Sequence, residues 1–588
     1  MTEKDYLMRL NMLFIFIVSM LAFSCSQRKF TGKETQNSQA QIGLTKSDLI
    51  TYQSHEFLAL SKRMRLEILE SFSLKLELEY VGLIVKKNSI QIDFEKIKKE
   101  SLNIESEIED FDELELQSSN LVSEFMDRED ARRFLLAKRN LDFYDRIKKI
   151  LAQFQDSHLT LTMNNELAYI FLPFKFKKIG DKYYISGIDG FIINQYLSEN
   201  KIPDLKFKIG MELTHINGLK VADYLAREIT PFVGLSSSNA TETRSLERLS
   251  IRNFKFPKDP NLKLTFKDQE SIKIPYRYIF SIIDRLDQFL YFKTLGYSEY
   301  PLNNSVNNKM ISTIRYSDFG NLSLSSHIAW KKIITNKDND ELMKLGIFII
   351  NQKAYGIISF SKFDRELNDK LPEVVQFLNY LNKQNIPLVI DLIDNVGGSL
   401  DTNNKLIGLF IKKDLALYQQ TVTSPSMLEI YTTEYIIKAT PNPIDPQQNI
   451  TQHLKDSTIL AKNIFKQQIV ILTSELCVSA CEIFTRILSK NSNALLMGST
   501  LSGTGLGFTS RNKSNSNWID PYNLFNLKIP NMLFYSTLDD LPNGPGSFEI
   551  KNYENKPFVP PYFYRTTLYD LENESLGWLE RAAELINK

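Results

Sequence analysis

The chain has 588 residues, with 71 Lys and Arg against 70 Asp and Glu, which gives a formal net charge of +1. At roughly 100–200 residues per domain, this length predicts several domains. The charge balance argues against nucleic-acid binding over the whole chain, because neutralising phosphates requires an excess of basic residues. Three Cys and five His exclude a disulfide scaffold and a Cys-rich zinc module, and they argue against a multi-histidine metal centre.

The N-terminal residues have the features of an export signal. Residues 12–23 (MLFIFIVSMLAF) are apolar except for one Ser, and this run is shorter than the roughly 20 residues that span a bilayer. Small residues precede Cys25 at both positions that a signal peptidase reads, and residues 21–25 (LAFSC) resemble a bacterial lipobox, in which the Cys is lipidated. We therefore predict a signal peptide at 1–24, a lipid on Cys25 and a flexible tether at 25–45. Plain secretion and an uncleaved anchor are the alternatives.

The next three regions differ in their residue patterns. Residues 46–155 carry apolar residues every three or four positions, which predicts a helical N-terminal region. Residues 156–281 contain short runs of β-branched and aromatic residues, broken by the turn signals Gly180-Asp181 and Asn217-Gly218, which predict β-hairpins. Residues 282–343 are rich in Asn and Ser and show little periodicity, so we predict an irregular insertion there.

From residue 344 to residue 588, short apolar runs alternate with helical patterns. Strands of five to seven apolar residues that alternate with helices indicate an α/β domain whose sheet is largely covered. The chain as a whole is therefore predicted to be a multidomain α/β protein. The predicted strands are 346–350, 355–360, 386–392, 469–473 and 494–498, and the predicted helices are 371–381, 404–411 and 480–489.

Three segments of this last region carry the candidate chemistry. In the first, IDLIDNVGG at 390–398, a buried strand runs into a double Gly, where backbone N–H groups can approach a bound atom closely. In the second, CVSACEI at 477–483, Ser479 lies at the start of a helix, where free N–H groups and the helix dipole would stabilise an oxyanion. The third is a Gly-rich loop at 498–507. Each has an ordinary explanation by itself, because a Ser at a helix start is usually an N-cap and a double Gly is usually a turn.

Taken together, these segments resemble the tail-specific, or C-terminal processing, serine peptidases and their tricorn-like relatives. The family pattern D-L-R-x-N-x-G-G is similar to residues 391–398, with Ile393 in place of Arg, and the pattern S-A-S-A-S-E-I is similar to residues 477–483. The resemblance implies a crotonase/ClpP-like catalytic domain at 344–588 that needs neither cofactor nor metal. It also implies that Ser479 is the nucleophile. The oxyanion hole would be formed by backbone N–H groups of Gly397, Gly398 and Ala480.

The general base cannot be the one that tail-specific proteases use, because Thr504 occupies the position of their catalytic Lys. The tricorn-like branch uses a His in a segment like D-x-H-T, and the segment QDSHLT around His158 is similar to it. This implies that His158 is the base, since an imidazole can accept the Ser proton and return it to the leaving amine. Glu554 lies in a segment similar to E-N-x-G-V-x-P-D of that branch and would orient His158, with Glu549 and Asp540 as substitutes.

The β-rich region carries a second likeness. Residues 209–218 (IGMELTHING) are similar to the stretch GD-x-I-x-x-I-N-G of PDZ-like modules, whose sheet edge takes an extended peptide. A hairpin in another small domain is the alternative. Within the tricorn-like branch, the chain is most similar to the group of the chlamydial protease-like activity factor. That resemblance implies that residues 282–343 block the active site until they are cut.

These observations predict an exported serine endopeptidase that cleaves polypeptides through an acyl-enzyme and is lipid-anchored in the bacterial cell envelope. The oligomeric state, monomer or homo-oligomer, is left open. Cys477 and Cys481, on either side of Ser479, are interpreted as small packing residues. The departures at Ile393, at Thr504 and around Glu554 leave an alternative, a catalytically inactive surface lipoprotein that binds peptides or a protein partner.

Overall fold

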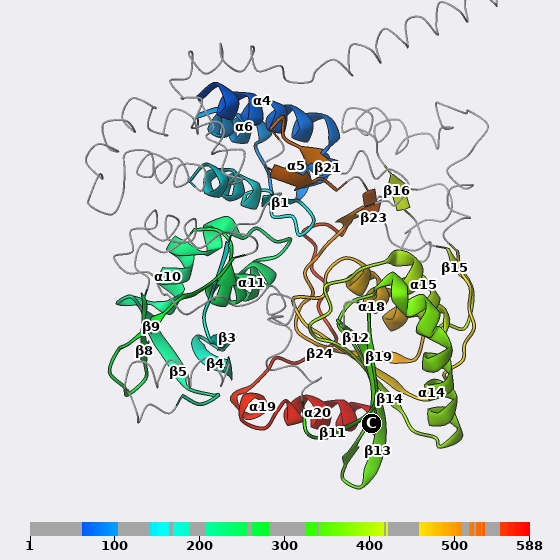
Figure 1. The fold of residues 1–588 in the computed structure, drawn as a ribbon. Helices are drawn as coiled ribbons and strands as arrows, with labels where there is room; N and C mark the ends of the chain where they lie inside the picture. Colours follow the sequence, from blue (N-terminus) through cyan, green and yellow to red (C-terminus); the bar gives the residue numbers. More distant parts are fainter. Residues whose placement is uncertain are drawn as a thin grey trace, which may run out of the picture. The chain divides into compact units, whose positions relative to one another are not determined.

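The computed structural model describes residues 62–103, 142–163, 168–188, 207–255, 261–280, 325–337, 340–416, 419–421, 458–508, 517–522, 525–530, 532–534 and 553–588. These residues form a mixed α/β structure with β-rich regions, as predicted (Figure 1). The export segment with Cys25, and the residues Asp540 and Glu549, lie outside the described part, as do residues 281–324 of the predicted insertion. Over the described residues, no helix combines the length and the apolar character that crossing a membrane requires.

The predicted N-terminal helices are confirmed where the structure describes them. They are α4 (Lys62–Glu79), α5 (Gly82–Ser89), α6 (Phe94–Asn103) and a helical stretch at 142–152. Apolar residues three or four positions apart share one face of a helix and are buried together, as in Ile68, Leu69, Phe72, Leu76, Tyr144, Ile147 and Leu151. Directly after this core, residues 155–159 form the loop that carries His158.

The β-rich region contains a six-stranded antiparallel sheet in the order β3-β4-β5-β8-β9, with β6 paired to β5. Both predicted hairpins are confirmed, and at the second turn Asn217 and Gly218 adopt the positive φ values of 49° and 79° that a tight turn requires. The strands are β3 (Phe174–Ile179), β4 (Lys182–Ile188), β5 (Glu212–Ile216), β6 (Leu219–Lys220), β8 (Asn261–Phe266) and β9 (Ile272–Pro275), and the helices of this region are α10 (Val221–Glu228), η2 (Thr230–Phe232) and α11 (Ser238–Ser250).

The C-terminal region is built on a seven-stranded sheet in the order β11-β12-β13-β14-β18-β19-β24. Its first three strands are antiparallel, and the pairs from β13 to β24 are parallel. The strands are β11 (Ile328–Thr335), β12 (Glu341–Ile350), β13 (Lys353–Phe360), β14 (Leu388–Leu392), β18 (Ile469–Thr473), β19 (Ala494–Gly498) and β24 (Tyr562–Phe563), and the helices are η5 (Arg365–Lys370), α14 (Leu371–Lys383), α15 (Leu400–Gly408), α18 (Ala480–Asn491), α19 (Leu568–Glu572) and α20 (Leu576–Ile586).

Part of the predicted insertion belongs to this sheet. Residues 328–335 form β11, and β12 begins at Glu341, so the prediction of irregular structure over 282–343 is wrong for these residues. The reason is that β11 is an edge strand of which only Ile328 and Ile334 are buried, while Lys331 and Lys332 are exposed. Charged residues on an edge strand protect it from pairing with other chains, and they also hide its apolar pattern.

Both faces of the seven-stranded sheet are covered by helices (Figure 1). Neighbouring residues of a strand point to opposite faces, so Ile390 and Ile471 join one core with α14, α15 and α18. Val389 and Val470 join a second core with Trp578 and other residues of α20. The parallel strands β14, β18 and β19 end at the same edge of the sheet, which brings the three candidate segments after them together.

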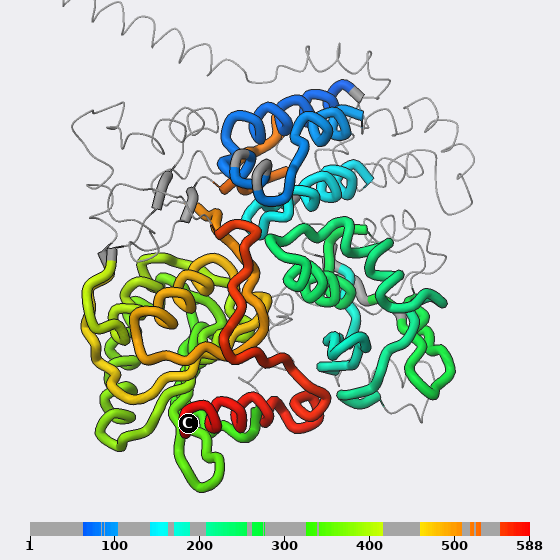
Figure 2. Tube along the Cα trace, turned by 180° about the vertical axis from the view of Figure 1, so that it is seen from behind, coloured from blue at the N-terminus to red at the C-terminus, as the bar shows by residue number. Residues whose placement is uncertain are grey.

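Smaller sheets join distant parts of the sequence. In one, β1 (Thr160–Met163), directly after the loop with His158, pairs with β22 (Phe525–Lys528), which also pairs with β21 (Asn517–Ile519). The chain from Tyr553 then leads past the Gly-rich loop to α19 and α20, as the red trace in Figure 2 shows. The remaining strands are β2 (Ala168–Phe171), β7 (Ile251–Arg252) and β10 (Arg277–Phe280), β15 (Leu415–Ala416) and β17 (Thr458–Ile459), and β16 (Gln419–Thr421), β20 (Leu506–Gly507) and β23 (Met532–Phe534).

Candidate active site

The first candidate segment forms a tight loop after β14. The buried carboxylate of Asp391 accepts hydrogen bonds from Ser359 Oγ at 2.7 Å and from the N–H of Ile393 at 3.1 Å, and burial raises its pKa. Asn395 is also buried, and its Nδ2 donates to the carbonyl of Phe360, at the end of β13, at 3.1 Å. These contacts fix the loop against β13 and hold the double Gly that follows it in place.

Ser479 adopts a backbone conformation that non-glycine residues rarely take. It directly precedes α18 with φ 56° and ψ −126°, and its side chain makes no capping hydrogen bond to the helix, so it is not acting as an ordinary N-cap. Such a conformation costs of the order of 1–3 kcal/mol and persists only where surrounding contacts impose it. The disulfide and the close approach of Gly397, described next, are such contacts.

A disulfide joins the residues on either side of Ser479. Cys477 and Cys481 are fully buried and bonded to each other, with their Cα atoms 5.3 Å apart. The interpretation of these residues as separate small packing groups is therefore wrong, because the start of α18 brings their side chains within bonding distance. By closing a short loop, the disulfide restricts the conformational freedom of the segment that carries Ser479.

Gly397 packs directly against Ser479. A Cβ atom on Gly397 would lie 2.6 Å from Val478 O, 2.9 Å from Ser479 Cβ and 3.1 Å from Ala480 N, and its φ is +89°. The position has no room for a Cβ atom, and its backbone conformation is one that residues with a side chain rarely adopt, so both features require Gly. The N–H of Gly397 donates to Asn395 Oδ1 at 2.8 Å.

Two of the three predicted oxyanion donors have an N–H group that is available to bind an oxyanion. In this arrangement, the contact with Asn395 occupies the N–H of Gly397, so the expected role of that N–H in the oxyanion hole is not met. Within the described part of the chain, the N–H groups of Gly398 and Ala480 have no hydrogen-bond partner. Ala480 is the first residue of α18, where N–H groups lack intrahelical acceptors and the helix dipole favours negative charge.

A glutamate of α18 fixes the Gly-rich loop to the helix. Glu482 is buried, and its Oε2 accepts hydrogen bonds from the N–H groups of Gly503 and Thr504, both at 2.9 Å. Its Oε1 pairs with Arg486 at 2.6 Å, while burial raises its pKa. Sequence reasoning missed Glu482, although it lies three residues after Ser479. Its contacts connect the nucleophile helix to the loop whose Gly505 N–H donates to Glu554.

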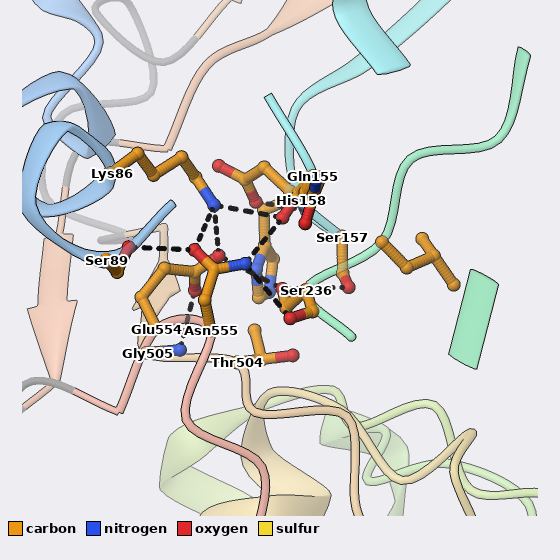
Figure 3. A network of polar contacts seen from close by, with 12 residues as sticks. Lys86, Ser89, Gln155, Ser157, His158, Ser236, Thr504, Gly505, Glu554 and Asn555 are labelled. Carbon is orange, nitrogen blue, oxygen red and sulfur yellow. Dashed lines mark hydrogen bonds and ion pairs between the residues drawn. The ribbon is translucent and has the colours of Figure 1, made fainter. Parts of the chain in front are cut away.

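His158 lies in the loop between the helical stretch 142–152 and β1 (Figure 3). Its backbone N–H donates to Asp156 Oδ1 at 2.8 Å, and its ring packs edge-on against Phe508 at 5.4 Å. Its Nδ1 is buried and has no hydrogen-bond partner among the described residues. Burial lowers the pKa of His158 below 6.5, Lys86 acts in the same direction and Asp156 opposes them. The ring is therefore neutral at pH 7, as a general base must be.

Glu554 is fully buried within the same cluster (Figure 3). Its Oε1 lies 2.5 Å from Lys86 Nζ and accepts a hydrogen bond from Ser236 Oγ at 3.0 Å, and its Oε2 accepts one from the N–H of Gly505 at 2.8 Å. Burial raises the pKa of Glu554 to about 7, with Asp156 acting in the same direction and Lys86 opposing both. The carboxylate is thus held by three partners from three parts of the chain.

The structure brings the predicted residues together in two groups. Ser479 packs against Gly397 at the start of α18, while His158 and Glu554 share the second cluster. The Gly-rich loop contacts Glu482 of α18 and Glu554 of the second cluster. Among the described residues, no hydrogen bond joins His158 to Ser479 or to Glu554. Sequence reasoning missed three members of the second cluster, which are Lys86, Ser236 and Asn555. Nothing in the sequence indicates Lys86, which lies 468 residues from Glu554.

The C-terminal region is similar to known peptidases. Residues 354–532 match the model of Peptidase family S41, and no curated protein gives a significant match. The solved structure of mature CPAF is similar with a TM-score of 0.59 and 14% identity, over 89% of this chain and 96% of that chain. CPAF in complex with lactacystin gives 0.57 and 14%, over 89% and 98%, and at such identity the likeness shows a shared fold. Residues 354–532 are therefore similar to Peptidase family S41, and this similarity supports a serine-type peptidase.

Proposed function

We propose that this chain is an endopeptidase in which Ser479 and His158 act as nucleophile and general base. The Oγ of Ser479 forms a bond to the carbonyl carbon of a peptide while His158 accepts the hydroxyl proton. The N–H groups of Gly398 and Ala480 hold the oxyanion. The C–N bond then breaks as His158 returns the proton to the leaving amine, and water hydrolyses the acyl-enzyme by the same route.

The backbone of Ser479 is the observation that carries this proposal. A hydroxyl used only for packing or capping has no need of φ 56°, a disulfide across it and a Gly pressed against its Cβ. Strain of this kind gathers at functional sites, where the surrounding contacts hold a reactive group in position. The unpartnered N–H of Ala480 beside it supplies the stabilisation that an attacking Ser requires.

The proposed role of Glu554 is to stabilise the His158 cation that forms during the reaction. The two side chains lie in one cluster, in which Glu554 is fully buried, and a buried carboxylate acts through a lower dielectric constant than one in water. Catalytic hydrogen bonds are often absent from a free enzyme and form when substrate binds. The free Nδ1 of His158 is the atom through which Glu554, or a water molecule bound to it, would act.

Labelling of the purified protein with a fluorophosphonate probe tests the proposal. We expect covalent labelling of the wild type at Ser479 and none of Ser479→Ala, because only an activated hydroxyl attacks the phosphorus. The folded state of both proteins is compared by circular dichroism. A folded wild type that never labels, and that instead binds peptides, would favour the alternative of an inactive binding protein.

We infer that the β-rich region is a PDZ-like module and that the catalytic domain is crotonase/ClpP-like. The six-stranded antiparallel sheet, with α11 packed against β3, supports the first assignment. The parallel strands β13 to β24, with helices on both faces, support the second. An exposed edge strand of such a module binds extended peptides through backbone hydrogen bonds.

We also propose that the protein is exported and lipidated at Cys25. The apolar run 12–23 and the lipobox-like segment support this location. The disulfide between Cys477 and Cys481 agrees with it, because disulfides persist in oxidising compartments. Growth with radioactive palmitate is expected to label the wild type and not Cys25→Ala. Equal labelling of both would exclude a lipid at this position, and an unlabelled wild type would favour plain secretion.

A further inference from the structure

Lys86 is a fully buried lysine whose ammonium group meets the catalytic cluster (Figure 3). It extends from α5 and has three oxygen partners, which are Glu554 Oε1 at 2.5 Å, the carbonyl of Gln155 at 2.9 Å and Asn555 Oδ1 at 3.1 Å. An ammonium group has three donors, and each of these three contacts can use one of them. Because a buried ammonium is costly unless it is fully paired, this site is built around the charge of Lys86.

The partners of Lys86 belong to both halves of the cluster. Gln155 lies three residues before His158 and has a φ of 48°, a strained value for a residue with a side chain. Asn555 follows Glu554, and its Nδ2 donates to the carbonyls of Gln155 at 3.3 Å and Ser236 at 2.9 Å. Lys86 therefore holds the start of the His158 loop and the Glu554 segment to the same point.

We propose that Lys86 is a positioning residue of the active site, which from α5 fixes the ionised Glu554 next to the His158 loop and so makes the N-terminal helices part of the peptidase. This inference rests on the proposed roles of Glu554 and His158. Among the described residues, Lys86 makes no hydrogen bond to Ser479 or His158, so it acts through Glu554.

The charges around Glu554 explain why this carboxylate needs a cation. Lys86 faces it from α5, Asp156 faces it from the His158 loop and Tyr80 from the turn between α4 and α5. Tyr80 Oη donates to Asp156 Oδ2 at 2.7 Å, while Ser236 and Gly505 supply a hydroxyl and an N–H to Glu554. Lys86 is thus the cation among these neighbours, and its removal leaves two buried carboxyl groups facing each other.

The pH dependence of fluorophosphonate labelling tests the inference on the full mature protein. The acidic limb is the pH below which the labelling rate falls as Glu554 takes up a proton. In Lys86→Met, we expect this limb to move to a pH about one to three units higher, since an adjacent opposite charge lowers a carboxyl pKa by that amount. Below this limb, each unit of displacement lowers the rate about tenfold. A lysine that only stabilised the fold would lower the amount of active protein and leave the limb unchanged.

Two variants complete the test. Lys98→Met removes a partly exposed lysine that joins α6 to Glu77 of α4 at 2.7 Å, and its rate and limb are expected to equal those of the wild type. In the Glu554→Gln background, which has no carboxylate to hold, Lys86→Met is expected to displace the limb less than it does in the wild-type background, because there Lys86 acts only on the pKa of His158.

Each outcome separates this inference from the proposed function. An unchanged limb in Lys86→Met, or an equal displacement of the limb in both backgrounds, would overturn the inference while Ser479-dependent labelling of the wild type upholds the peptidase. If Lys86→Met alone does not fold, the comparison of Glu554→Gln with the double variant still tests the inference. A limb displaced by the full one to three pH units between these two proteins would overturn it. A wild type that never labels would overturn both proposals.

Discussion

Replacing His158 by Ala is expected to lower kcat/KM for peptide hydrolysis about 10³-fold or more, because Ser479 then has no group to accept its proton. The fluorophosphonate labelling rate should fall with it, since the same proton must leave when the probe reacts. The measurement is the rate of both reactions for the wild type and His158→Ala. Circular dichroism and thermal unfolding establish that the variant is folded.

The control for this variant is another half-buried His. His215 lies in β5, where its Nδ1 is 3.1 Å from Thr214 Oγ1, and His215→Ala is expected to retain the wild-type rate. A His158→Ala protein that still labels at the wild-type rate would show that Ser479 uses another base or none. Slow activity of His158→Ala that rises when imidazole is added would support the assignment, because the free base can occupy the space that the side chain leaves.

The pKa of His158 determines the pH range in which this side chain can act as the general base. Burial lowers the pKa below its usual 6.5, so the ring stays neutral, and able to accept a proton, somewhat below pH 6.5. As the pH falls through the lowered pKa, the ring takes up a proton and the base is lost. Burial therefore extends the working range of His158 toward acid.

The parts of the fold that the sequence predicts well are those set by local patterns. The strands 469–473 and 494–498 and the start of α18 at Ala480 agree with the structure, because buried parallel strands are nearly continuous runs of apolar residues. The position of Ser479 can also be predicted from a local pattern, because the strand, loop and helix around it are contiguous in the sequence. The edge strand β11 was missed because its exposed face carries charged residues.

The parts of the site that sequence could not predict depend on contacts between distant segments. The acceptor of the Gly397 N–H is a side chain oxygen two residues away, and no residue pattern shows that the loop turns back on itself. The pairing of Lys86 with Glu554 joins segments 468 residues apart. A lysine in an amphipathic helix is usually solvated, so its burial arises only when the N-terminal helices pack against the catalytic region.

Replacing Glu554 by Gln is expected to lower kcat/KM about 10²- to 10⁴-fold, as in other triads whose carboxylate is neutralised. The sign of the pH effect follows from the two pKa values. The pKa of Glu554 is raised to about 7, so the carboxylate is charged only above that pH, whereas His158 is neutral down to below pH 6.5. The acidic limb of the wild-type profile should therefore lie near pH 7 and belong to Glu554.

In Glu554→Gln, His158 alone sets the acidic limb, so the residual activity should persist to below pH 6.5. The measurement is kcat/KM from pH 5 to 9 for both proteins. The variant also leaves Lys86 buried without its counter-charge, which costs about 3–5 kcal/mol of stability. Lys86→Met with Glu554→Gln removes both charges and should recover most of that stability while kcat/KM stays low. If activity recovered together with stability, Glu554 would serve the fold alone. The cation of His158 would then be stabilised by another group, for which Asp156 on the same loop is the candidate.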